Sequence, residues 1–512
     1  MPSITGGEFI KDARLVFDET IIGRGINNPS TFRKAEPWLP DKWDEETDVL
    51  VLGAGLAGLS ATIEVVDNGA SVILLEKMSS VTSSQSARSV GNVAGAGSKM
   101  QAKAGIKDSP EQWRKDIVSK GESRLIPPEL LDILTGSGGS HIDWLQEMGV
   151  PFIYICYRAP DSVPRAHIVE GDAQPIGTAL AEKAKEKGVR ILLDTRAMEL
   201  CRRADNRIVG VRAETKGGKT ITLKAKKATI LCTGDYSASK EIKAKYTSVP
   251  EDAVAEIAGN PGNTGDGFIM AWAVGADSTC LDDVGEPNGL YMFPNQPKGT
   301  GISEYLIKAG AIILNKDGKR FQNETVSIGG KAVYGQPDQV AFVVFDSEAA
   351  TTDVVPEGAP TGRGPWICTC RYLDNWRKFP GAVNEADTIE ELARKLGVSA
   401  SGLSETVNKY NSYVDAGKDS DFGRTNLGPG LRKPPFIGLG PGRPMVIMSN
   451  GTLMVNNKHQ VLDVFGKVIP GLYAAGDMGK SGKIVGHGTH LAWACISGRR
   501  SGKFAAAEPS EG

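Results

Sequence analysis

The chain has 512 residues, 40% of them hydrophobic, and its 59 Lys and Arg nearly balance its 61 Asp and Glu. This length allows two or three domains with a large core, which excludes a disordered chain, and the net charge of −2 gives no attraction to nucleic acid or anionic membranes. No apolar stretch approaches the roughly 18 residues that a membrane span needs, and the start resembles no export signal, so we expect a cytoplasmic protein.

The 7 cysteines and 62 glycines are the informative minor components. An odd, sparse set of cysteines does not predict a disulfide framework, and Cys368 and Cys370, the only close pair, lack the further ligands of a metal site. Glycine exceeds its average of about 7%, which is typical of chains with many tight turns or close backbone approaches to a ligand.

The first half of the chain reads as a polar arm followed by alternating strands and helices. Residues 1–44 are polar with scattered prolines and predict an N-terminal arm. The apolar run 48–52 predicts a buried parallel strand, and 56–61 and 71–76 predict the helix and second strand of a βαβ unit. Further helices are predicted at 109–120, 141–148 and 176–187, and further strands at 189–193, within 197–223 and at 228–232.

The second half begins with an inserted region. Residues 286–436 are irregular and rich in Pro and Gly, with only short regular pieces such as a helix at 388–395, and they predict a separate domain. Strands at 453–455 and 472–475 and a closing helix at 491–506 then return the chain to the first domain.

The sequence Gly53-Ala54-Gly55-Leu56-Ala57-Gly58 follows the first predicted strand and opens a helix. The first glycine permits the turn, the second lets a pyrophosphate approach the backbone, and the third lets the helix pack on the strand. Glu76 ends the next strand about 20 residues further on, where an acidic residue accepts from a ribose hydroxyl. In this context the motif predicts dinucleotide binding.

Residues 469–477 resemble the second flavin motif of FAD-dependent oxidoreductases, in which a strand brings an acidic residue, here Asp477, to the ribityl chain. Residues 228–234 and 263–267 share this resemblance. The whole stretch 46–507 resembles the fumarate reductase/succinate dehydrogenase flavoprotein family, which includes the 3-ketosteroid dehydrogenases. Its shared signatures are 311–324 and His487-Gly488.

The resemblance implies an α/β fold in which a Rossmann-like FAD-binding domain, 45–285 and 437–512, is interrupted by an α+β capping domain, 286–436. Membrane-bound relatives attach FAD through a histidine where this chain has 83–87, which contains none, so we expect non-covalent FAD. The usual Gly-Gly is Ser83-Ser84 here. The implied cofactor-binding residues are Gly53, Gly55, Leu56, Ala57, Gly58, Glu76, Lys77, Gln85, Ser86, Gly91, Asn92, Ala197, Thr233, Gly234, Asp266, Gly476, Asp477, Cys495 and Ile496.

The family moves a hydride between flavin N5 and a carbon beside an electron-withdrawing group, while an acid or base handles the proton on the neighbouring carbon. The proton donor, an arginine in fumarate reductases and a tyrosine in steroid Δ1-dehydrogenases, falls on Ile328 here. Two substrate histidines of fumarate reductases fall on Met448 and near Phe293. Fumarate is therefore not the expected substrate.

His490 falls where the family has a carboxylate-binding arginine, at the start of the last helix. The helix dipole disfavours a cation there, so we expect a neutral imidazole that donates to a developing oxyanion, which favours a carbonyl substrate; the alternative is a capping or packing residue. Glu304 in Ser303-Glu304 matches a substrate-orienting pair and is a candidate base, or else an ordinary ion-paired carboxylate. Tyr291 is the preferred phenol donor, unless it is simply a half-buried tyrosine. Weaker candidates are Tyr334, His167, Arg443 and His487, the last more typical of a structural flavin-loop residue.

These residues predict an FAD-dependent oxidoreductase acting on the carbon-carbon bond of a small molecule next to a carbonyl, as an ene-reductase or ketosteroid dehydrogenase-like enzyme. One alternative is a reductase of an unsaturated carboxylic acid with altered catalytic residues, and another is an FAD-bearing electron-transfer or binding subunit. The sequence contains no haem or iron-sulfur motif, so the electron donor or acceptor is expected to be diffusible. A homo-oligomer is compatible with these observations.

Overall fold

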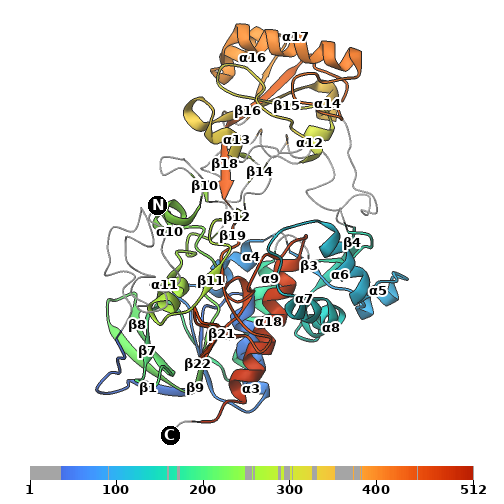
Figure 1. Ribbon diagram of the computed structural model, residues 1–512. Coiled ribbons are helices and arrows are strands. Elements are labelled where there is room, and N and C mark those ends of the chain that lie inside the picture. The colour runs from blue at the N-terminus through green and yellow to red at the C-terminus, as the bar shows by residue number, and fades with distance from the viewer. Residues whose placement is uncertain are drawn as a thin grey trace. The chain divides into compact units, whose positions relative to one another are not determined.

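The computed structural model describes residues 36–89, 91–157, 161–169, 173–247, 249, 256–257, 260–285, 290–292, 300–301, 304–325, 331–351, 373, 377, 381, 383–446 and 448–510. Its contacts divide the chain into two compact units (Figure 1). The first comprises Met1–Ser248, Gly259–Val284 and Met448–Gly512, and the second Val249–Ala258 and Gly285–Ile447. The second unit extends past the predicted limit at 436 because β18 (Phe436–Val446) belongs to its sheet.

The first unit is built on a mainly parallel sheet whose strand order, within the described residues, is β21-β22-β9-β1-β2-β6. Its strands are β21 (Gln460–Leu462), β22 (Val468–Ala474), β9 (Thr220–Leu231), β1 (Glu45–Leu52), β2 (Val72–Leu75) and β6 (Arg190–Leu192). Val51 pairs with Leu74 on one side and Ile230 on the other, and both ladders are parallel. The apolar runs of β1 and β2 are buried because both faces of a parallel sheet are covered.

Two antiparallel strands, β7 (Thr195–Arg202) and β8 (Ile208–Thr215), extend the sheet from the first half of β9. The region predicted to be β-like between 197 and 223 is therefore a meander whose last strand continues into the parallel sheet. This continuity places the end of β9 beside the ends of β1 and β22.

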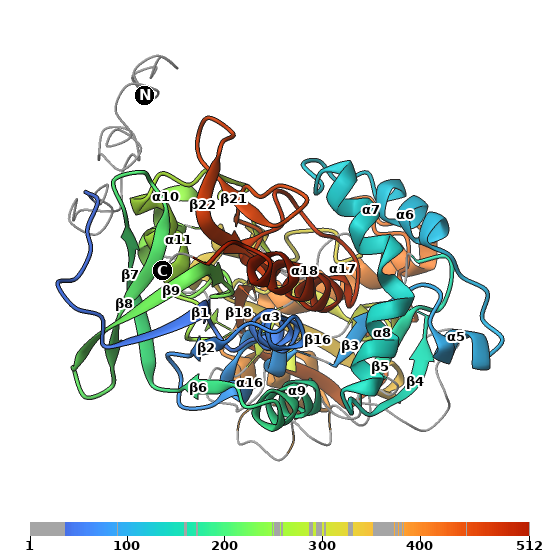
Figure 2. The same ribbon diagram turned by 90° about the horizontal axis from the view of Figure 1, so that it is seen from below.

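Three helices pack together along the parallel sheet: α3 (Leu56–Asp67) lies between α9 (Gln174–Glu186) and α18 (Thr489–Ala506) (Figure 2). Glycines make the approach of α3 and α18 close. A Cβ on Gly498 would lie 2.2 Å from the Ala57 carbonyl oxygen, and one on Gly502 2.4 Å from that of Ala61. The start of α3 is thereby fixed against the chain that follows β22.

A smaller sheet, β3-β5-β4, and a group of helices follow the βαβ unit. The predicted helix at 109–120 is confirmed as α6 (Pro110–Ser119), with Ser109 accepting from the Gln112 backbone N–H as the N-cap. The predicted helix at 141–148 begins three residues earlier, at Gly138. The elements are β3 (Asn92–Ala94), β4 (Phe152–Cys156), β5 (Ala166–Val169), α5 (Lys99–Lys103), α6, α7 (Pro128–Gly136) and α8 (Gly138–Glu147).

The second unit has its own sheet, in which β14-β13-β18-β16-β15 are neighbours and β10 and β17 also pair with β18. Its strands are β10 (Glu256–Ile257), β13 (Leu290–Met292), β14 (Thr300–Gly301), β15 (Ile312–Leu314), β16 (Ala341–Asp346), β17 (Val383–Ala386) and β18. Its helices are α12 (Glu304–Lys308), α13 (Lys331–Tyr334), α14 (Ser347–Thr351), α16 (Ile389–Leu396) and α17 (Ala400–Ala416). The predicted helix at 388–395 is confirmed as α16, capped by Thr388, whereas α17 was not expected.

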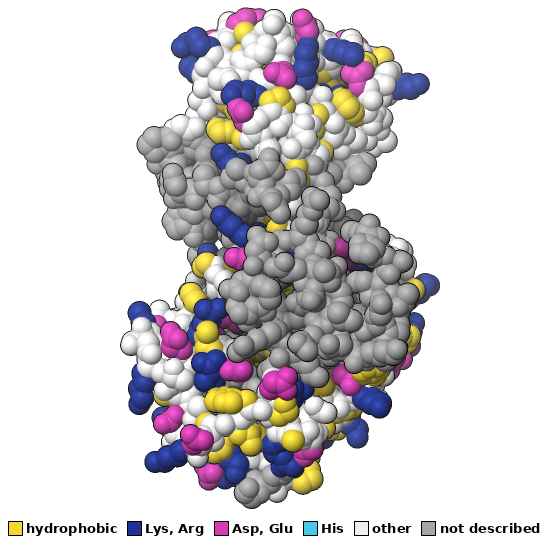
Figure 3. All heavy atoms as spheres, turned by 60° about the vertical axis from the view of Figure 1, so that its left-hand side comes forward, with side chains coloured by type: hydrophobic (Ala, Val, Ile, Leu, Met, Phe, Trp, Pro, Cys, Tyr) yellow, Lys and Arg dark blue, Asp and Glu magenta, His cyan; other side chains and the backbone are white. Residues whose placement is uncertain are grey.

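The remaining short elements are η3 (Val81–Ser83), α4 (Gln85–Arg88), α10 (Lys240–Tyr246), α11 (Asp266–Ala273), β11 (Ser278–Thr279), β12 (Val284–Gly285), η4 (Pro337–Gln339), β19 (Met448–Ser449), β20 (Thr452–Leu453) and η5 (Gly476–Met478). Basic and acidic side chains are interspersed over the described surface in Figure 3. Within the part of the chain that the structure describes, none of the helices has both the length and the apolar composition that crossing a bilayer needs.

Candidate functional site

A cavity with an empty volume of about 820 Å³ lies in the first unit, where the strands of the parallel sheet end. Fourteen of the residues predicted to bind the cofactor line it: Gly53, Gly55, Leu56, Ala57, Glu76, Lys77, Gln85, Ser86, Ala197, Thr233, Gly234, Asp266, Gly476 and Asp477. They come from segments far apart in the sequence, because β1, β2, β9 and β22 are neighbours in the sheet.

The glycine-rich turn leads from β1 into α3 at the floor of the cavity. Gly53 has a φ of +101°, and a Cβ there would lie 2.4 Å from the Cys232 carbonyl oxygen, so only glycine fits. Gly55 is the N-cap of α3, and a Cβ there would meet nothing nearer than 3.8 Å, so space remains in front of this helix end. The backbone N–H groups of the first turn and the helix dipole suit a phosphate anion. Gly58 packs against Gly53, outside the cavity.

Glu76 follows β2 and is 8% exposed. Its carboxylate accepts from the backbone N–H of Ala54 and from that of Met78, both at 2.8 Å. These bonds hold the side chain over the glycine turn, and each oxygen keeps a lone pair for a further donor such as a ribose hydroxyl.

An ionic cluster lies beside Glu76. Asp266 at the start of α11 accepts from Lys77 Nζ at 2.9 Å and forms a two-point ion pair with Arg196 at 2.8 and 2.9 Å. Burial alone would raise the pKa of Asp266, but Arg196 and Lys77 lower it below its ordinary value. Asp266 therefore stays ionised and joins the ends of β2, β7 and α11 around the cavity.

At the end of β22, Asp477 projects from η5 and lines the cavity, with 22% of its side chain exposed. Its Oδ1 atom accepts from His490 Nδ1 at 3.0 Å, and Lys480 Nζ lies 3.5 Å away. Burial would raise the pKa of Asp477, but the charge of Lys480 and the hydrogen bond from His490 lower it well below its ordinary value. Asp477 is thus an anionic group at the cavity wall.

The sequence predicts that His490 has a free N–H for the substrate, but in the structure both of its ring nitrogens face protein atoms. Nε2 lies 3.0 Å from the Ile484 carbonyl oxygen, so both ring nitrogens face acceptors. A neutral imidazole carries one N–H, and only the imidazolium form donates to both. The sequence did not reveal these contacts with Asp477 and Ile484.

The other predicted cofactor residues lie outside the cavity lining. Gly91 accepts from the backbone N–H of Val169, and Asn92 in β3 lies against Gly488. Cys495 and Ile496 are buried in α18. Their contribution to cofactor binding stays a prediction.

The predicted substrate residues belong mostly to the second unit. Tyr291 lies in β13, where its backbone pairs with Arg443 of β18, and Glu304 begins α12, but the side chains of Tyr291 and Glu304 are outside the described residues. Tyr334 ends α13. Phe293, Ser303 and Ile328 also lie outside the described residues. The catalytic roles of Tyr291 and Glu304 therefore remain predictions.

The string Arg165-Ala166-His167 is fully buried in β5 and the turn before it. Arg165 is paired with Asp108 at 3.0 Å and Asp116 at 2.6 Å. His167 Nε2 contacts Ser98 Oγ at 2.7 Å. These contacts indicate a structural role for the string.

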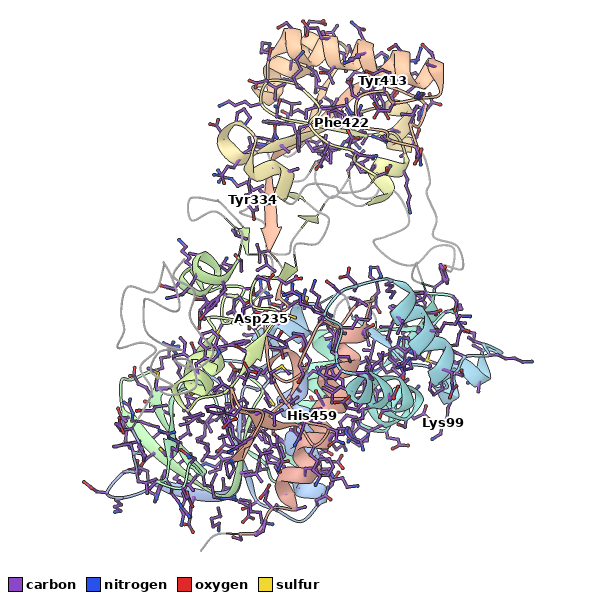
Figure 4. The ribbon with its side chains drawn as sticks, in the orientation of Figure 1. Lys99, Asp235, Tyr334, Tyr413, Phe422 and His459 are labelled. Carbon is purple, nitrogen blue, oxygen red and sulfur yellow. The ribbon has the colours of Figure 1, made fainter. Side chains whose placement is uncertain are left out.

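Ten further residues line the cavity, of which four lie in the flavin motifs named from the sequence, Ser84, Cys232, Asn263 and Ala475. The six that sequence reasoning missed are Leu52, Leu75, Thr195, Asn260, Gly262 and Ala494. Several of these residues are next to predicted cofactor residues in the sequence. Those at the ends of the parallel strands could have been predicted from their places there. Asn263 is held by Asp235, a buried carboxylate that accepts from Asn263 Nδ2 at 2.8 Å and from the Ser449 backbone N–H at 2.6 Å (Figure 4). Burial, and then the charge of Asp477, raise the pKa of Asp235.

The lining fits FAD. The N-terminus of α3 faces the cavity and could bind the pyrophosphate. The carboxylates of Glu76 and Asp477 are available to the ribose and the ribityl chain of FAD, respectively. Among the described residues no group of three or more His, Cys, Asp or Glu is arranged to hold a metal ion, and Cys368 and Cys370 lie outside them.

Comparison with known proteins agrees with this site. Residues 48–488 match the family described as FAD binding domain. A probable fumarate reductase of Shewanella frigidimarina is 29% identical over 503 residues, which cover 93% of this chain and 80% of the relative. A urocanate reductase of Eggerthella lenta is 30% identical over 495 residues, covering 93% and 77%.

Two solved structures share the fold. The open conformation of a flavocytochrome c3 fumarate reductase has a TM-score of 0.77 and 28% identity, covering 91% of this chain and 78% of that one. A 3-ketosteroid-Δ4-(5α)-dehydrogenase of Rhodococcus jostii RHA1 has a TM-score of 0.66 and 25% identity, covering 91% and 98%. The resemblance inferred from the sequence motifs is confirmed: the chain belongs to this FAD-binding family of fumarate reductase-like and ketosteroid dehydrogenase-like flavoproteins, and is an FAD-dependent oxidoreductase acting on CH–CH groups.

Proposed function

We propose that the protein reduces, or in the reverse direction dehydrogenates, a carbon-carbon bond next to a carbonyl group in a substrate that lacks the second carboxylate of fumarate. FAD, when bound, supplies hydride transfer at its N5 atom. The proposed substrate class rests on the contacts of both His490 ring nitrogens. His490 lies at the position where fumarate reductases bind a substrate carboxylate with arginine.

A carboxylate of the substrate would need a free cation or free N–H groups at this position. Both nitrogens of His490 already face oxygen acceptors, at 3.0 Å from Asp477 and 3.0 Å from Ile484. A second anion beside Asp477 would be repelled by that carboxylate. The site therefore supports an uncharged or monoanionic substrate with a conjugated carbonyl.

The proton for the neighbouring carbon needs an acid or base within hydrogen-bond reach of the substrate. We propose Tyr291 and Glu304 for this role, as the sequence resemblance implies, with a diffusible electron donor or acceptor. Substitution to Phe and Gln, respectively, is expected to reduce turnover by about 10²- to 10⁴-fold while FAD remains bound, measured by steady-state rates and the flavin spectrum.

A second candidate is reduction of an unsaturated acid, which the similarity to a urocanate reductase and to fumarate reductases favours. The two candidates differ in the group that activates the double bond. They predict different oxidants for the reduced flavin.

The test is an anaerobic titration in which the flavin is first reduced and its reoxidation is then followed by the recovery of flavin absorbance. Conjugated ketones and conjugated acids of the same carbon skeleton are compared in pairs. We expect the ketones to reoxidise the flavin and dicarboxylates such as fumarate to leave it reduced. Rapid reoxidation by the acids alone would favour the second candidate, and reoxidation only by protein carriers would contradict both and indicate an electron-transfer subunit.

A further inference from the structure

His490 joins two segments at the start of α18. Its Nδ1 atom faces Asp477 in η5, directly after β22, and its Nε2 atom faces the carbonyl of Ile484 in the loop that leads to α18. The side chain is 25% exposed. It is therefore partly enclosed, with both of its polar atoms directed at groups of the first unit.

His490 makes a shorter contact with the Asp477 carboxylate than Lys480 does. Lys480, whose side chain is fully buried, places Nζ 3.2 Å from the backbone oxygen of Asp477 and 3.5 Å from Oδ1. The contact from His490 Nδ1 to the same Oδ1 is shorter, at 3.0 Å. A charge-assisted hydrogen bond at this distance orients a carboxylate, whereas the longer contact mainly compensates its charge.

The loop before α18 is held in place without the contact to Ile484. The Lys483 backbone N–H donates to the Arg124 carbonyl at 2.7 Å, and the Ile126 N–H donates to the Lys483 carbonyl at 3.0 Å. A Cβ on Gly482 would lie 2.6 Å from the Leu125 carbonyl oxygen, which shows how closely the two segments pack. The path of the loop therefore does not require His490.

We propose that His490 is a positioning residue: its Nδ1–H holds the carboxylate of Asp477 toward the FAD cavity, and the side chain is not the proton donor to the substrate. This role depends on FAD binding, which the family membership establishes, and not on the class of substrate. Removal of the bond leaves the cavity-lining carboxylate free to rotate, so FAD is released faster.

Three variants of the full-length holoenzyme test this role. His490→Leu removes both donors. His490→Asn places an amide nitrogen near the position of Nδ1, toward Asp477, whereas His490→Gln extends an amide nitrogen to the position of Nε2, toward Ile484. The last two are a matched pair, because each amide retains one of the two hydrogen bonds and the side chain is partly exposed.

The measurement is the rate of FAD release after dilution, followed by the rise in flavin fluorescence. We expect release to be about ten-fold faster for His490→Leu and for His490→Gln, and close to wild type for His490→Asn. In an Asp477→Asn background the three variants are expected to release FAD at equal rates, because the acceptor has changed.

Two results would overturn the proposal. Slow release in His490→Gln with fast release in His490→Asn assigns His490 to holding the loop through Ile484. Unchanged release in all three variants with a loss of turnover assigns it to the substrate.

Discussion

At the scale of single residues, two ion pairs neutralise the charge of Asp266, a carboxylate that lines the cofactor cavity. Asp266 is ionised, and Lys77 and Arg196 balance its charge. Arg196 is half exposed, so its pairing with Asp266 is partly screened by solvent. The strength of FAD binding should therefore depend on Arg196 to a modest and salt-sensitive degree.

We expect Arg196→Ala to weaken FAD binding by about two- to five-fold, because it removes a two-point ion pair from a cavity-lining carboxylate. The measurement is the dissociation constant of FAD by fluorescence titration at low and high salt, and the effect should shrink at high salt. Arg212→Ala is the matched control, since Arg212 forms a similar pair with Glu199 on the same meander, away from the cavity. An equal loss in both variants would contradict the specific role of Arg196.

At the scale of elements, the site depends on the close packing of α3 on α18. The glycine turn sets the start of α3, and the approach at Gly498 and Gly502 fixes its direction. A methyl group at either glycine would meet a carbonyl oxygen of α3, which is backbone and cannot rotate away.

We expect Gly498→Ala to lower the free energy of unfolding by about 1–3 kcal/mol, because the two helices must separate to admit the methyl group. Gly136→Ala is the control: Gly136 ends α7 in open space, with nothing within 4 Å of a Cβ, and the change should stabilise by about 0.5–1 kcal/mol. Urea unfolding of both variants with saturating FAD is the measurement. Equal stability in the two variants would show that the helices separate without cost.

At the scale of the whole molecule, buried neutral histidines link stability to pH. Burial lowers the pKa of His141 to about 3, of His167 to about 4 and of His459 to about 3. His459 packs its ring on Trp493, and both ring nitrogens are buried with no hydrogen-bond partner among the described residues (Figure 4). In the unfolded chain these groups take up protons near pH 6.5. Their stabilisation is therefore complete above that pH and is lost as the pH falls.

We expect the free energy of unfolding to fall by about 1.4 kcal/mol per pH unit for each such histidine between about pH 6 and 4.5. His459→Asn should remove the contribution of one histidine from this slope, because asparagine does not titrate. Asparagine also tolerates the φ of +66° at this position. Urea unfolding at several pH values measures the slope, and the carboxylates common to both proteins cancel. An unchanged slope would mean that His459 is not neutral in the fold.

Much of the fold could be predicted from local patterns. The βαβ unit, the capped helices α6 and α16 and the FAD family follow from runs, caps and motifs within short windows. The helix α17 was missed, although Leu403, Thr406, Val407 and Tyr410 form its buried stripe, because its many polar residues weaken the apolar pattern.

The sequence by itself determined where the cofactor binds: Gly53 has a backbone role that no other residue can fill, Gly55 leaves the start of the helix open, and the ends of parallel strands must meet at one edge. Only the tertiary structure decided the partners of the side chains around that edge. Asp266 meets Arg196 and His490 meets Asp477 through bonds between segments that the fold brings together. A histidine at a helix start could be expected to keep its N–H groups for a substrate, but the fold places the Asp477 carboxylate and the Ile484 carbonyl oxygen against its two ring nitrogens.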